Sequence, residues 1–135
     1  MYRKLIAIFL PLILLLNGCA SSHKDITREE IVHAYQEAGY EVLFRDYDEP
    51  MEYGQIGYIR ADHPDGDYIY FSVFETEDQA KAYEQEYYHP IAMGLFLSIY
   101  AGEIHIPKWD VYGCYVAQYK NPAYFDVFQE LIKSK

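Results

Sequence analysis

Cysteines and basic residues are both scarce in this 135-residue chain, which has 2 cysteines and 11 lysines and arginines against 21 aspartates and glutamates. With a net charge of −10, the chain lacks the positive surface that nucleic-acid binding requires. The same deficit argues against adhesion to anionic lipid headgroups by charge alone. We therefore exclude nucleic acids as partners, and any attachment to a membrane has to come from another feature.

The short motifs of common enzyme and metal sites are also missing. The chain has no glycine-rich phosphate loop, no Gly-x-Ser-x-Gly, no His-Glu-x-x-His and no Cys-x-x-Cys. Its 5 histidines include no closely spaced pair, and the turn from Asp62 to Asp67 does not fit a calcium-binding EF-hand loop. We expect no catalytic residue, no metal ion and no cofactor.

The only long apolar run at the start of the chain extends from Leu5 to Leu16, after the basic pair Arg3-Lys4. A membrane-spanning helix needs about 20 apolar residues, so this run is too short to serve as one. A basic start followed by a short apolar run is typical of an export signal. The sequence therefore predicts that the chain leaves the cytoplasm.

The end of this run, Leu16-Asn17-Gly18-Cys19, resembles the lipobox of bacterial lipoproteins. The resemblance covers residues 1–19 only. It implies that residues 1–18 are a signal peptide that is removed, and that Cys19 becomes a lipidated N-terminus on the extracytoplasmic face of the cell membrane. The alternative is an ordinary secretory signal that contains a cysteine by chance.

Lipidation has consequences for the rest of the chain. Residues 19–26 become the lipidated cysteine and a short tether, and residues 27–135 become a single globular domain. A lipid on Cys19 leaves no partner for a disulfide within the chain, so we expect Cys114 to be a buried, inert thiol in the middle of a strand. The stability of the domain then has to come from its apolar core.

Capping motifs and hydrophobic periodicity predict the elements of the domain. Two capping boxes, Thr27–Glu30 and Thr76–Gln79, begin helices over 28–38 and 77–88, and Asn121-Pro122 begins the last helix. The predicted strands are 40–47, 55–61, 67–74 and 110–119. The apolar segment 91–101 is expected to pack on the core.

The order of elements is helix, three strands, helix, strand, helix. Consecutive strands without intervening helices favour antiparallel pairing. We therefore expect an α+β fold with an antiparallel sheet of about four strands and helices packed on one face.

The 16 tyrosines are the most unusual part of the composition. Alternation places Tyr68 and Tyr70 on one face of a strand, where their rings form a candidate binding surface. The alternative is that tyrosine simply favours half-buried sheets. The sequence thus favours a non-catalytic binding or accessory module that recognises an envelope protein or a cell-wall component. A small surface hydrolase, with a site assembled by the fold, remains the alternative.

Overall fold

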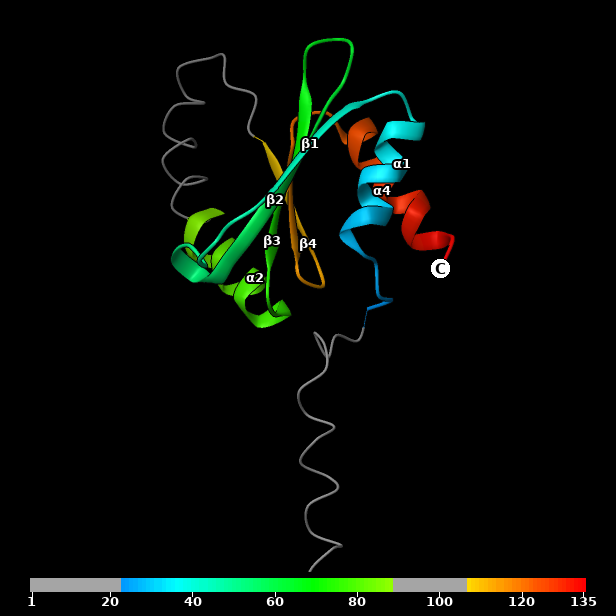
Figure 1. Cartoon of the computed structure of the whole chain (residues 1–135). Helices are drawn as coiled ribbons and strands as arrows, with labels where there is room; N and C mark the ends of the chain where they lie inside the picture. The colour runs from blue at the N-terminus through cyan, green and yellow to red at the C-terminus, as the bar shows by residue number, and fades with distance from the viewer. Residues whose placement is uncertain (1–22, 89–106) are drawn as a thin grey trace, which may run out of the picture.

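Five strands form one antiparallel sheet in the computed structural model, which describes residues 23–88 and 107–135 (Figure 1). In sheet order these are β1 (Glu41–Asp46), β2 (Gln55–Asp62), β3 (Tyr68–Phe74), β5 (Tyr115–Tyr119) and β4 (Lys108–Tyr112). Every neighbouring pair is antiparallel. The predicted α+β class and antiparallel pairing are confirmed, and β2 and β3 form a hairpin.

The predicted single strand over 110–119 is two strands, which is why the sheet has five strands and not four. Gly113 adopts a positive φ of 54°, and the chain reverses there so that Tyr112 pairs with Tyr115. Cys114 therefore lies in a turn and is half-buried, not buried in mid-strand as the sequence predicted. It is also disulfide-bonded, and its partner lies outside the described residues. The expectation of an unpaired thiol is wrong for this structure.

Two helices cover one face of the sheet and enclose the main core. Helix α1 (Arg28–Glu37) begins with the predicted Thr27–Glu30 capping box, and helix α4 (Pro122–Lys133) begins with Asn121 accepting the Ala123 N–H. Gly39 follows α1 with a φ of 88°, as expected for a helix terminator. The fully buried residues on this side include Ile31, Tyr35, Ile59, Ala61, Ile69, Phe71 and Phe128.

The remaining described helix packs on the opposite face, so the helices are not all on one side as the sequence predicted. Helix α2 (Glu77–Tyr83) continues into the π-helical turn η3 (Glu84–Tyr88), and the short helix η2 (Glu52–Gly54) lies beside them. Strand alternation turns Phe74 away from the main core, and Ala80 of α2 packs with Phe74 and Val116. Figure 1 shows α2 on the other side of the sheet from α1 and α4.

The first described residues pack against the domain. Ile26 is buried in the main core, and its carbonyl accepts a hydrogen bond from the Tyr115 hydroxyl at 2.9 Å. The Lys24 carbonyl accepts one from the Tyr112 hydroxyl at 3.3 Å. The proposed signal peptide and the apolar segment 91–101 lie outside the described residues. None of the described helices has the length and apolar character needed to cross a membrane.

Candidate binding face

The β2–β3 hairpin brings four side chains onto the sheet face opposite α1 and α4. The hairpin closes with the His63 N–H donating to the Asp67 carbonyl at 2.8 Å. This register pairs Arg60 with Tyr70 and Asp62 with Tyr68. We call the set Tyr58, Arg60, Tyr68 and Tyr70 the tyrosine–arginine strip.

Arg60 is held between a carboxylate and a ring. Its Nε and Nη2 atoms donate to the Asp62 carboxylate at 3.0 and 2.8 Å, and its guanidinium carbon lies 4.3 Å from the centre of the Tyr68 ring. The hydrogen bond to Asp62 raises the pKa of Arg60, which therefore stays charged. Since 44% of the side chain is exposed, part of this oriented cation still faces solvent.

The other two rings of the strip form a stack. Tyr58 and Tyr70 lie 5.4 Å apart with an interplanar angle of 17°, and Tyr47 leans on Tyr58 at 6.1 Å. All three are half-buried. Burial raises the pKa of Tyr70, and the neighbouring Tyr47 raises it further, so its hydroxyl remains protonated at neutral pH. The strip thus offers flat apolar surface edged with hydrogen-bonding groups.

The strip is bordered on one side by the cluster in which Ala80 of α2 packs with Phe74 and Val116. Tyr83 of α2 stacks on Trp109 at 5.7 Å and packs against Phe74 at 5.1 Å. Next to Tyr70 on β5 stands Gln118, and a shallow hollow of about 40 Å³ beside Tyr68 is also lined by Lys120. The described residues therefore leave the end of the face around Arg60 and Tyr68 partly open.

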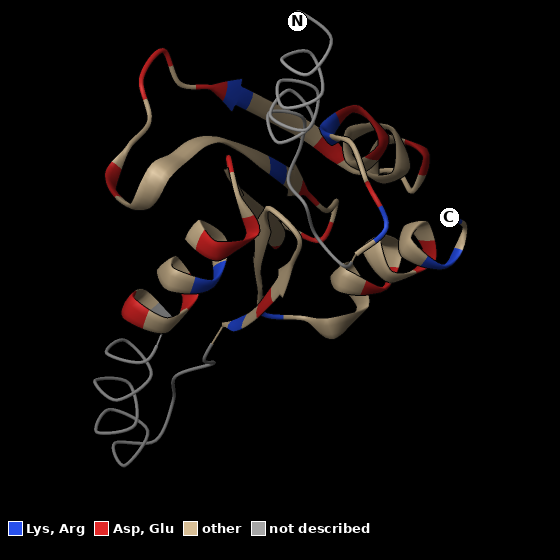
Figure 2. Cartoon of the chain, turned by 90° about the horizontal axis from the view of Figure 1, so that it is seen from below, with Lys and Arg blue, Asp and Glu red and all other residues tan. Residues whose placement is uncertain are grey.

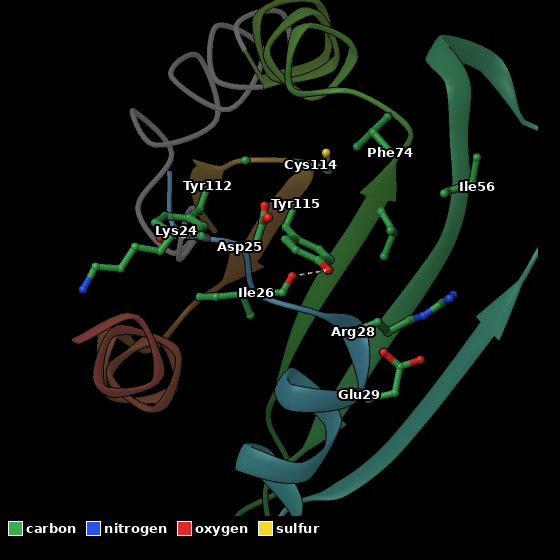
Figure 3. Close-up of a pocket in the computed structure, with 12 residues that line it drawn as sticks. Lys24, Asp25, Ile26, Arg28, Glu29, Ile56, Phe74, Tyr112, Cys114 and Tyr115 are labelled. Carbon is green, nitrogen blue, oxygen red and sulfur yellow. Dashed lines mark hydrogen bonds between the residues drawn. The ribbon is translucent and has the colours of Figure 1, made fainter. Parts of the chain in front are cut away.

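A larger cavity of about 290 Å³ lies at the other end of the sheet, beside the N-terminal segment (Figure 3). Figure 3 shows residues of this segment, the end of β3 and the β4–β5 turn around it. Several of its polar groups already have partners inside the protein, such as the Tyr115 hydroxyl on the Ile26 carbonyl and Arg28 in an ion pair with Asp46. These two contacts tie the N-terminal segment to β5 and α1 to β1.

A cluster of His63, Asp65, Tyr40 and Tyr124 joins the β2–β3 turn to α4. The His63 ring stacks on Tyr124 at 5.1 Å and meets Tyr40 edge-on at 4.9 Å, while the Tyr124 hydroxyl donates to the Asp65 carboxylate. That bond keeps the pKa of Asp65 below its usual value and raises the pKa of Tyr124 to about 12. We infer that this cluster, which we call the clamp, holds the β2–β3 turn against α4.

Acidic residues outnumber basic ones along both α1 and α2 (Figure 2). In the acidic loop after β1, Asp48 and Glu49 are exposed. No three metal-binding side chains converge anywhere in 23–88 or 107–135.

The structure places both predicted binding residues, Tyr68 and Tyr70, on one face and brings Tyr58 and Arg60 to them. Sequence reasoning missed these two partners. The signal was present, because the hairpin turn at 63–67 fixes the register, and the register places Arg60 opposite Tyr70.

No protein-family model, curated protein or solved structure matches this chain.

Proposed function

We propose that this protein is a lipoprotein, anchored by a lipid on Cys19 to the extracytoplasmic face of the cell membrane, whose domain is a non-catalytic binding module. The observation that carries the binding role is the tyrosine–arginine strip. We further propose that its ligand is a cell-wall glycan.

The chemistry of the strip supports a carbohydrate ligand. Sugar rings present apolar C–H faces that stack on aromatic rings, and hydroxyls around the edge that bond to planar polar groups. Tyr68 and the Tyr58–Tyr70 stack provide the rings, while Arg60, Asp62 and Gln118 provide donors and acceptors around them. The net negative charge of the chain disfavours polyanionic ligands, because like charges repel.

The test is co-sedimentation of the full detergent-solubilised chain with isolated cell wall. We expect Tyr68→Ala to weaken binding by up to about tenfold, since losing one ring stack costs roughly 0.5–1.5 kcal/mol. Tyr70→Ala should weaken binding too, and thermal melting of each variant shows whether the fold is kept. The control is His33→Ala, which removes an exposed ring from α1, on the opposite side of the sheet from the strip.

Treating the wall before the assay separates the two kinds of partner. If a glycan hydrolase abolishes binding and a protease does not, the glycan proposal is supported. Binding lost only after protease treatment would show that the partner is an envelope protein. Equal loss of binding in Tyr68→Ala and His33→Ala would show that the strip is not the binding surface.

A further inference from the structure

Strand β1 forms a free edge of the sheet and carries unusual apolar surface (Figure 1). In the described part of the chain, the exposed large hydrophobic side chains are Leu43, Phe44 and Met51, with 57%, 53% and 55% of their surface open. The first two lie on β1 itself and the third in the loop after it. Proteins normally protect an edge strand against pairing with other chains, and an exposed apolar edge is a site for strand addition.

The hydrogen bonds fix which backbone groups of β1 face outward. The Tyr47 N–H donates to the Ile56 carbonyl, so this pair is hydrogen-bonded in the antiparallel β1–β2 ladder. Because hydrogen-bonded and non-hydrogen-bonded pairs alternate, Arg45, Leu43 and Glu41 also direct their backbone groups toward β2. Val42 and Phe44 therefore direct their N–H and C=O groups toward the free edge.

The side chains of β1 are self-complementary about Leu43. If a second β1 pairs antiparallel with Leu43 opposite Leu43, then Glu41 stands opposite Arg45 and Val42 opposite Phe44, twice each. Glu41 and Arg45 are exposed, lie on the same sheet face as Leu43, and make no ion pair within the described residues.

The backbone and side-chain patterns agree in this register. Val42 and Phe44, whose backbone groups point outward, become the hydrogen-bonded pairs. Leu43–Leu43 and Glu41–Arg45 become the non-hydrogen-bonded pairs, in which side chains approach most closely. We propose that β1 is a homodimerisation edge, which joins two copies of this chain into a continuous ten-stranded sheet through this register.

A disulfide trap tests the register, because a residue on the two-fold axis meets its own copy. In membranes of cells that express the full chain, Leu43→Cys should give a dimer band on mild oxidation, since the paired Cα atoms lie about 4.5 Å apart. The matched control is Phe44→Cys, which is similarly exposed. Its copies lie about 8 Å apart in this register, too far to be bridged. The wild-type chain sets the baseline given by the native cysteines.

Charge reversal tests the pairing independently. In the Leu43→Cys background, Arg45→Glu places like charges opposite each other at both ends, and we expect the dimer band to be lost. Adding Glu41→Arg to Arg45→Glu restores opposite charges and should restore the band. Equal bands for Leu43→Cys and Phe44→Cys would overturn the proposal, as would a Leu43→Cys band that both charge variants leave unchanged. Crosslinking of Leu43→Cys to a different protein only would also overturn it.

Discussion

Among single residues, Tyr124 shows how one hydroxyl ties distant parts of the chain together. Its hydroxyl donates to Asp65 in the β2–β3 turn, and its carbonyl accepts from the Tyr35 hydroxyl at 2.7 Å in the core beneath. The turn that sets the register of the tyrosine–arginine strip is thus attached to α4. We therefore expect that loss of the Tyr124 hydroxyl changes the environment of Asp65 in the β2–β3 turn.

We predict that Tyr124→Phe raises the pKa of Asp65 toward its ordinary value, because the hydroxyl is the main cause of the lowered pKa. A lowered folded-state pKa stabilises the protein above the unfolded pKa of about 3.9, and this contribution is lost as the pH falls through the folded pKa. The variant should therefore melt at a lower temperature than wild type at pH 7, and the gap should close below about pH 4. An NMR titration of the Asp65 carboxyl measures the shift directly.

Tyr68→Phe is the control, since it removes a hydroxyl from the other face of the sheet. It should leave the pKa of Asp65 unchanged. An Asp65 titration identical in wild type and Tyr124→Phe would show that the clamp does not form in solution.

Among the elements, α1 depends most clearly on its first turn. Thr27 Oγ accepts the Glu30 N–H at 3.3 Å, and the Glu30 carboxylate accepts the Thr27 N–H at 2.8 Å. We predict that Thr27→Ala lowers the free energy of unfolding by about 1 kcal/mol, because it leaves a helix N–H without its cap. Chemical denaturation of the full chain measures the change. Thr27→Ser keeps the hydroxyl, so destabilisation of equal size in both variants would count against the capping role.

Local signals explain why most elements were predictable. Both capping boxes, Gly39 and Asn121-Pro122 act within four residues of the helix ends they specify, so the sequence alone located these ends. The side of the sheet that α2 covers is different, since it depends on Phe74 and Val116, which come together only when β3 pairs with β5. The sequence predicts Gly113 within a strand because Tyr112 and Tyr115 on either side of it both favour strands.

The candidate site also has one part that local sequence predicts and one part that depends on the pairing of strands. Tyr68 and Tyr70 share a face because residues two apart always do in a strand. Arg60 reaches Tyr68 only through the register of two strands, and alternation within one strand gives no information about that.

For the whole molecule, the chemistry of Cys19 is the decisive property. A thioether to lipid and a disulfide cannot share one sulfur atom. Cys114 is disulfide-bonded in this structure and Cys19 is the other cysteine of the chain, so lipidation of Cys19 requires that Cys114 is not paired with it in the mature protein. We predict that cells fed an alkyne fatty acid label the wild-type chain and do not label Cys19→Ser. An unlabelled wild-type chain, in which Cys114 reacts with maleimide only after reduction, would contradict lipidation and support a disulfide instead.

The docking of Ile26 into the core beside α1 also bears on how an anchored domain meets its ligand. The four residues 19–22 reach at most about 14 Å, so an anchor at Cys19 would hold His23, which contacts Glu77 of α2 and Tyr112 of β4, close to the bilayer. Rotation about an axis normal to the sheet, as in the proposed β1 dimer, keeps both strips on the same face of the continuous sheet. A polymer that repeats its binding unit then meets two sites at once, and the second contact forms at the high effective concentration set by the first. Avidity of this kind lets a weak single site retain a long wall strand.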